Sequence, residues 1–142
     1  MNLVYSVGES RSKIREIQAN IKNGVMSELV NKASNESIYM LSAKMLESIL
    51  QGLSIKNIVE YDEKLKIYTV FNGIVPHFYG EGSTKEIAES NMVDEAIMFS
   101  KDYLENVEMF SGIFSGIQQF LISIIILNID DRQRIMEILK IA

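Results

Sequence analysis

The sequence contains no cysteine and only one proline and one histidine among its 142 residues. Without cysteine the chain can form no disulfide, no thiolate metal site and no cysteine nucleophile, and this absence favours a reducing compartment. The lone His77 lacks the second histidine or the paired base that a metal site or a hydrolytic triad needs. We therefore expect a cytoplasmic protein that is not an enzyme and that takes no metal or other cofactor.

Positive charge is also scarce, because 14 Lys and Arg residues stand against 19 Asp and Glu residues, which gives a net charge of −5. Such a chain lacks the broad basic surface through which nucleic-acid binders release counterions from phosphates. Its charge suits a protein that binds other proteins, including basic ones. The N-terminal residues show no charged lead followed by an apolar run, so we expect no signal peptide.

A hydrophobic fraction of 47% and this length predict one domain, residues 1–142, with a real core. We expect its first part, residues 1–53, to be helical. A first helix, capped by Ser10 or Ser12, is indicated by apolar residues that share one helical face: Ile14, Ile17, Ile21 and Val25. A second is expected over residues 34–51, capped by Ser34 or Asn35 and stopped by Gly52.

Residues 54–104 predict a unit of strands, a turn and a helix. Strands are expected over residues 55–61, 65–71 and 74–79 because β-forming residues are frequent there. Asn72-Gly73 is typical of a tight hairpin, and Pro76 marks the third strand as an edge or bulged strand. A helix over residues 84–104 should begin at Ser83 or Thr84. The fold class is therefore α+β: N-terminal helices, a small antiparallel sheet of about three strands with a packed helix, and a C-terminal apolar helical segment.

That C-terminal segment belongs to residues 105–142, in which residues 109–129 carry no charge. The run is long enough to span a bilayer, which takes about 20 apolar residues, and Gly112 with Gly116 makes a GxxxG helix-packing pattern. A buried helix, a dimer interface and a membrane span are all open. We expect a homo-oligomer, and the candidate interface residues are Phe110, Gly112, Ile113, Gly116, Ile117 and Phe120. A short last helix after Asp130 or Asp131 follows.

The turn Gly80-Glu81-Gly82-Ser83-Thr84-Lys85 opens a predicted helix, so its backbone N–H groups could face an anion. Candidate contacts for RNA or another anion are Ser83, Thr84 and Lys85. The turn lacks the GxxxxGK[ST] spacing of a phosphate loop, and the alternative is a plain strand-to-helix turn with a Ser or Thr cap.

The run GEGSTKEIAESNMVDEAI that begins at Gly80 resembles the last helix of the double-stranded-RNA-binding domain. The positions in register are Gly80, Gly82, Thr84, Lys85, Ala88, Ala96 and Ile97. The resemblance covers about residues 36–104 and implies the order helix, three strands, helix. Only Lys85 remains of the phosphate-binding lysines, because Glu86 and Glu89 occupy the other positions, and Asp62-Glu63-Lys64 replaces the family's Gly-Pro-x-His loop. The resemblance therefore implies the fold of this domain, whereas we do not expect RNA binding.

The same region also resembles small antitoxins of the HicB kind, in which a strand pair ending in a G-x-T turn leads into an acidic helix, although the register slips by one residue. This resemblance implies an acidic protein that neutralises a basic nuclease. We expect a non-enzymatic protein-interaction module of the antitoxin, immunity or inhibitor type, with a protein partner. The alternatives are a degenerate double-stranded-RNA-binding protein and a protein that associates with a membrane through residues 109–129.

Overall fold

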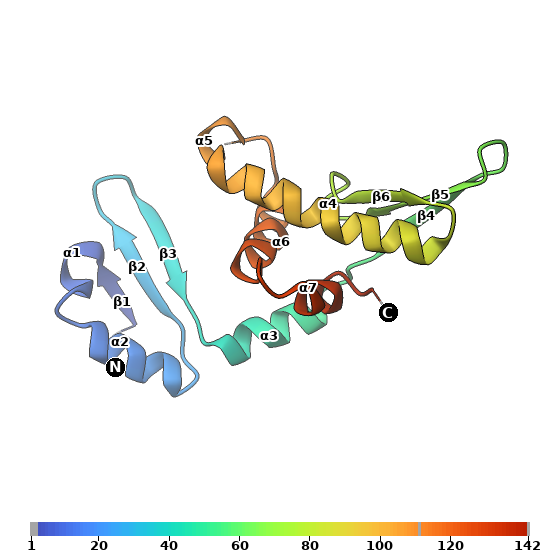
Figure 1. The fold of residues 1–142 in the computed structure, drawn as a ribbon. Coiled ribbons are helices and arrows are strands. Elements are labelled where there is room, and N and C mark those ends of the chain that lie inside the picture. Colours follow the sequence, from blue (N-terminus) through green and yellow to red (C-terminus); the bar gives the residue numbers. More distant parts are fainter. Residues whose placement is uncertain (1–2, 111, 142) are drawn as a thin grey trace. The chain divides into compact units, whose positions relative to one another are not determined.

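A computed structural model of the chain describes residues 3–110 and 112–141, and Figure 1 shows its elements. Within these residues the chain forms seven helices and two three-stranded sheets, so the predicted α+β class is confirmed. The chain divides into two compact units, Met1–Leu53 and Ser54–Ala142, which we call unit 1 and unit 2.

Unit 1 contains, in chain order, β1 (Val4–Ser6), α1 (Val7–Ser10), α2 (Ile14–Lys22), β2 (Ser27–Asn31), β3 (Glu36–Met40) and α3 (Ala43–Gly52). The central strand, β2, pairs parallel with β1 and antiparallel with β3. Parallel neighbours need a crossover connection, which α1 and α2 supply (Figure 1). Tyr5 and Ile17 are buried at the centre of this unit, and Asn20 Nδ2 donates a hydrogen bond of 3.1 Å to Tyr5 Oη.

The helix expected over residues 34–51 is wrong in its first half, because Glu36–Met40 forms strand β3. Asn35 adopts a positive φ of 58° and so closes a turn rather than capping a helix. The backbone N–H and C=O groups of β3 are instead hydrogen-bonded in an antiparallel ladder with β2. The helix starts only at α3, where Ser42 Oγ accepts a hydrogen bond of 3.1 Å from Met45 N–H.

The first predicted helix is present as α2, but neither expected serine caps it. The residue in the N-cap position is Lys13, and it makes no side-chain capping bond. Ser12 Oγ instead donates to the carbonyl of Glu9, at the end of α1. The periodicity of the apolar residues was therefore informative, whereas the choice of cap was not.

Unit 2 contains β4 (Asn57–Asp62), β5 (Ile67–Asn72), β6 (Tyr79–Gly82), α4 (Lys85–Glu105), α5 (Val107–Phe110), α6 (Gly116–Leu127) and α7 (Arg132–Ile138). Its strands form an antiparallel sheet in the order β4-β5-β6. The long helix α4 packs on β5 and β6, and α6 and α7 pack on α4. The largest buried core side chains are Val70, Val75, Phe78, Met92, Val93, Leu121, Ile122, Ile125, Ile135 and Leu139.

The two glycines of β6 allow this strand to lie directly against α4. A Cβ atom on Gly80 would lie 2.2 Å from the backbone nitrogen of Met92 and 2.3 Å from the carbonyl oxygen of Ala88. A Cβ atom on Gly82 would lie 2.7 Å from the backbone nitrogen of Ala88. All three distances are far inside van der Waals contact, so only glycine fits at these positions. The G-x-G pattern is thus a requirement of strand–helix packing.

The strand expected over residues 74–79 is also wrong, because residues 73–78 form a loop and β6 begins at Tyr79. The Asn72 side chain organises this loop: its Oδ1 accepts hydrogen bonds of 2.9 Å from the N–H groups of Ile74 and Val75. The Asn72 N–H donates to the carbonyl of Phe78, also at 2.9 Å. Asn72-Gly73 therefore starts a wider loop, in which Asn72 makes an Asx turn, rather than a two-residue hairpin.

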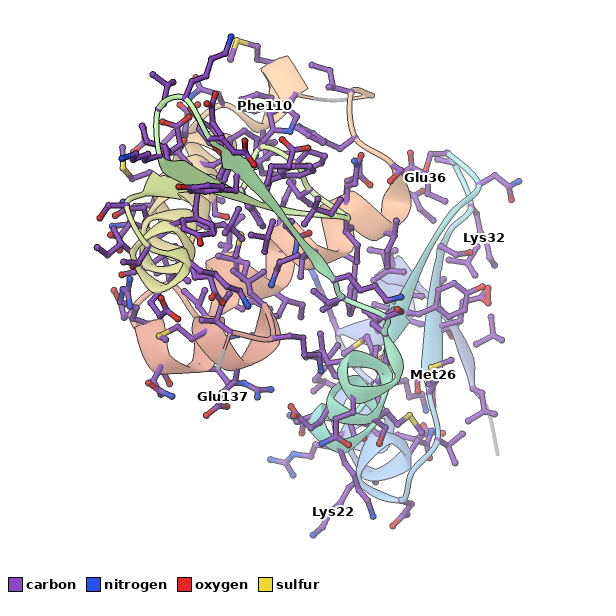
Figure 2. All side chains as sticks on the ribbon, turned by 90° about the vertical axis from the view of Figure 1, so that its right-hand side faces the viewer. Lys22, Met26, Lys32, Glu36, Phe110 and Glu137 are labelled. Carbon is purple, nitrogen blue, oxygen red and sulfur yellow. The ribbon has the colours of Figure 1, made fainter. Side chains whose placement is uncertain are left out.

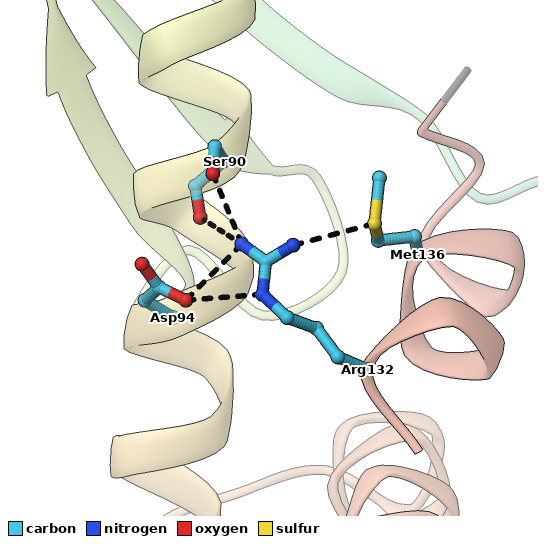
Figure 3. Close-up of polar contacts among 4 residues, drawn as sticks. All are labelled: Ser90, Asp94, Arg132 and Met136. Atoms are coloured by element: carbon cyan, nitrogen blue, oxygen red, sulfur yellow. Dashed lines mark hydrogen bonds and ion pairs between the residues drawn. The ribbon is translucent and has the colours of Figure 1, made fainter.

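The last helix is attached to both α4 and the sheet. Arg132 of α7 forms an ion pair with Asp94 of α4 and bonds to Ser90 (Figure 3). At the other end of α7, the carbonyl of Leu139 accepts a hydrogen bond of 2.7 Å from Asn57 Nδ2 on β4. Asp131 caps α7 by accepting from the N–H of Arg134, as one of the two caps proposed from the sequence.

Candidate functional site

The three candidate anion contacts, Ser83, Thr84 and Lys85, lie together at the start of α4, but two of them already have partners. Thr84 Oγ1 accepts a hydrogen bond of 3.1 Å from the N–H of Ile87 and so caps the helix. Lys85 Nζ lies 3.9 Å from Glu89 Oε1 in an ion pair one helical turn along. These contacts stabilise a strand-to-helix turn with a threonine cap, which was the alternative interpretation of this motif.

The predicted GxxxG face is wrong, because Gly112 and Gly116 do not lie on one helix. Helix α5 ends at Phe110 and α6 begins at Gly116, while Gly112, with φ of 81°, lies in the connecting segment. Ser115 and Gln118 form a capping box that starts α6. Because this capping box starts a new helix, the uncharged run does not form one continuous helix. Among the described residues, no helix has both the length and the apolar composition that crossing a bilayer requires.

A cluster of rings supports this region, and we call it the aromatic cluster. Its members are His77, Phe78, Phe99, Tyr103, Phe110 and Phe114. The ring centroids of His77 and Phe99 are 5.0 Å apart, and those of Tyr103 and Phe110 are 5.4 Å apart in a stacked arrangement. Phe114 is buried. The lone histidine and one predicted interface residue, Phe110, are therefore parts of a packed cluster, and no sequence signal had connected them.

Apolar side chains are exposed at the C-terminal end of α4, on α5 and at the start of α6, and we call these residues the α5 corner. It consists of Leu104, Val107, Met109, Ile113 and Ile117, which are between 44% and 66% exposed. A cavity of about 440 Å³ is lined by residues 104–109 at this corner. Two predicted interface residues, Ile113 and Ile117, belong to this surface, and Gly112 and Gly116 lie exposed next to them. Phe120 is only partly exposed on α6.

The charged side chains within residues 104–117, which include the α5 corner, are all carboxylates. Glu105 and Glu108 line its cavity, and the sequence has no lysine or arginine between Lys101 and Arg132. Figure 2 shows all the described side chains, with Phe110 labelled at this end of unit 2. The residues of the α5 corner thus combine exposed apolar groups with carboxylates, and the nearest cation along the chain is Lys101, one helical turn before Glu105. In the described residues, no three side chains of the metal-binding types come close enough together to hold a metal ion.

The net charge of the protein is distributed unequally between the two units. Unit 1 has six Lys and Arg residues and five Asp and Glu residues, a net charge of +1. Unit 2 has eight and fourteen, respectively, a net charge of −6. The acidic character that the composition indicated is therefore a property of unit 2 alone.

Comparisons with known proteins give the family. The family model described as "PHD_like: Antitoxin of toxin-antitoxin, RelE / RelB, TA system" matches residues 1–141. A solved structure, an antitoxin part of a putative toxin/antitoxin system from Syntrophomonas wolfei subsp. wolfei, superposes with a TM-score of 0.64. The match covers 92% of this chain and 94% of that chain at 12% sequence identity, so it shows a shared fold. The comparison with curated proteins finds no match. Because the family model covers nearly the whole chain, this protein belongs to the PHD-like antitoxins of RelE/RelB toxin–antitoxin systems, and it is a non-enzymatic antitoxin whose partner is a toxin protein.

Proposed function

We propose that this antitoxin neutralises its toxin by stoichiometric binding and that the toxin surface it contacts is basic. The observation that carries the proposal is the net charge of −6 on unit 2, beside +1 on unit 1. Opposite charges attract over about one Debye length, roughly 8 Å at physiological salt, and raise the rate of association. Unit 2 is thus suited to capture a basic protein, and unit 1 supplies none of that attraction.

The proposal is tested with the full chain and its toxin. The toxin is recovered as the protein that co-purifies with the tagged chain in a fixed ratio, and it is then purified alone. Calorimetry should show a saturable complex whose affinity falls as the salt concentration rises from about 0.05 M to about 0.3 M, because salt screens exposed charges.

Charge reversal in each unit provides the matched control. Glu105→Lys in unit 2 should weaken the complex and reduce its salt dependence, whereas Glu36→Lys in unit 1, also at an exposed glutamate, should leave both unchanged. A complex that is insensitive to salt, or one that responds equally to the two substitutions, would refute the electrostatic part of the proposal. Failure to form any complex would refute the proposal as a whole.

Self-association, predicted from the uncharged C-terminal run, stays a prediction. Light scattering on the full chain at micromolar concentration measures it directly. A monomeric mass would contradict the predicted homo-oligomer without affecting the proposed neutralisation of the toxin.

A further inference from the structure

We infer that the α5 corner is the surface on which the toxin docks. The inference rests on the proposed function and goes further, because it names the site and the chemistry of the surface that fits it. That surface carries an apolar side chain that enters the cavity and is flanked by lysine or arginine residues.

The apolar side chains of the corner are unusually exposed. Met109 and Ile113 are 66% and 63% exposed, and Leu104 is 59% exposed. Isolated apolar side chains are common on protein surfaces, but here Leu104, Val107 and Met109 line one cavity, as in sites that bind other proteins. Ile113 is exposed a few residues further along the chain. The cavity volume of about 440 Å³ leaves room for a large side chain from a partner.

Ring packing holds α5 against the end of α4. Phe110 stacks on Tyr103 with ring planes inclined by 16°, and it also contacts Phe114 with centroids 6.0 Å apart. Phe110 closes α5 and Tyr103 lies in the last turns of α4, so this stack fixes one helix against the other. A surface that is already ordered loses little conformational entropy on binding, which favours affinity.

Charge complementarity identifies the occupant of the corner. Glu105 and Glu108 line the cavity, and the 30 residues between Lys101 and Arg132 contain no cation. The C-terminal end of α4, a helix of 21 residues, adds the partial negative charge of its last carbonyl groups. The carboxylates of Glu105 and Glu108 and the last carbonyl groups of α4 therefore all attract a basic protein surface.

A second copy of this chain fits the corner less well. Two-fold pairing through this surface would place Glu105 and Glu108 of one copy near the same residues of the other copy, and the segment from residue 102 to residue 131 supplies no cation to compensate. Like charges placed together in an interface disfavour it. The charges therefore select a basic partner over a homodimer at this site.

The test removes apolar surface without adding charge. In the full chain, Met109→Gln and Ile113→Ser are combined, and binding to the purified toxin is measured by calorimetry. We expect affinity to fall by a factor of about 30 or more, which corresponds to the loss of about 2 kcal/mol that marks an interface hot spot. Both side chains are exposed, so the unfolding midpoint of the variant should stay close to that of the parent chain.

A matched control lies at the opposite end of the same unit. Leu65, in the β4–β5 turn, is 68% exposed, so Leu65→Gln removes a similar apolar group away from the corner (Figure 1). It should leave toxin affinity unchanged. A second arm, Glu105→Gln with Glu108→Gln, should weaken binding at low salt and have less effect at high salt.

The possible results separate the inference from the proposed function. If the parent chain binds the toxin and the corner variant binds equally well, or no worse than the Leu65 variant, the inference is overturned and the proposed function stands. If the parent chain binds no toxin, the proposed function fails and the inference falls with it. If light scattering shows that the parent chain is a dimer and that the corner variant is a monomer, the corner is a self-association surface and the inference is overturned.

Discussion

Arg132 of α7 and Asp94 of α4 form a fork in which two guanidinium nitrogens share one carboxylate oxygen. Nε and Nη2 of Arg132 donate to Asp94 Oδ1 at 3.2 and 3.1 Å (Figure 3). Nη2 also lies 3.0 Å from the carbonyl oxygen and from the hydroxyl oxygen of Ser90. One side chain therefore connects the last helix to two successive turns of α4.

This contact leads to the first prediction, a small, salt-dependent coupling. The side chains of Arg132 and Asp94 are 41% and 58% exposed, so the pair should contribute about 1 kcal/mol or less. A double-mutant cycle with Arg132→Ala and Asp94→Ala, measured by urea unfolding, should give a coupling that shrinks at high salt. Arg132→Lys should recover only part of it, because an ammonium group cannot reproduce the fork. Full recovery by lysine would contradict this account.

The second prediction concerns the close approach of β6 to α4. Gly80→Ala should lower the free energy of unfolding by about 3 kcal/mol, because the added methyl group would overlap the backbone of the helix, which cannot move aside as a flexible side chain can. Urea unfolding of unit 2 measures the effect.

Gly116→Ala is the control for this substitution. Gly116 is the first residue of α6, and nothing lies within 4 Å of a Cβ atom there. Its replacement should be neutral or should stabilise the protein by up to about 1 kcal/mol, because alanine restricts the unfolded chain. Equal effects at the two glycines would show that the strand–helix contact is looser than described.

The third prediction is an alkaline loss of stability that originates in unit 1. Burial raises the pKa of Tyr5, and the nearby Glu16 raises this pKa further. Because the folded state holds the phenolic proton more tightly, the contribution of Tyr5 is fully present below its ordinary pKa of about 10 and is lost as the pH rises above it. Tyr5→Phe should flatten the dependence of the unfolding midpoint on pH between about pH 9 and pH 11.

An exposed tyrosine provides the comparison. A hydrogen bond to Glu28 raises the pKa of Tyr39, whose side chain is largely exposed. Tyr39→Phe should flatten the profile less than Tyr5→Phe does, since solvent screens the charge at this site. An identical profile for the parent chain and the Tyr5 variant would contradict the assignment.

The fourth prediction is that double-stranded RNA binds weakly or not at all. Lys85 is paired with Glu89, and Glu86 adds a further negative charge in the first turn of α4. These carboxylates repel phosphates rather than releasing counterions. A gel-shift assay at about 0.15 M salt should show no sub-micromolar binding. Sub-micromolar binding that is lost on Lys85→Glu would refute this prediction, and Glu86→Lys with Glu89→Lys should raise any residual affinity.

Sequence reasoning identified two helix caps correctly, although it missed the start of α2 and the loop after Asn72. Thr84 and Asp131 were among the proposed caps, and each begins its helix because a side-chain oxygen accepts a backbone N–H three residues on. The prediction failed where pairing between strands distant in the sequence determines the secondary structure. Ile38 has the spacing of a helical face, yet it pairs with Leu29 of β2 in a sheet that no local pattern indicates.

The candidate site shows the same division. The exposed apolar residues Ile113 and Ile117 were found because an uncharged run is visible in the sequence. The aromatic cluster was not, since His77, Phe99 and Phe114 come from a loop, a helix and an interhelical segment that only the folded chain brings together. The antitoxin function was anticipated through the weaker resemblance, although the matching family is PHD-like.

The bond between Asn57 and Leu139 has a consequence for protein synthesis. These residues are 82 positions apart, so the first strand of unit 2 acquires this bond only after almost all of the unit has been translated. At about 5–20 residues per second, the delay on the ribosome is on the order of ten seconds. Under the proposed function, a newly made toxin therefore meets a complete unit 2 only on molecules whose translation has passed Leu139.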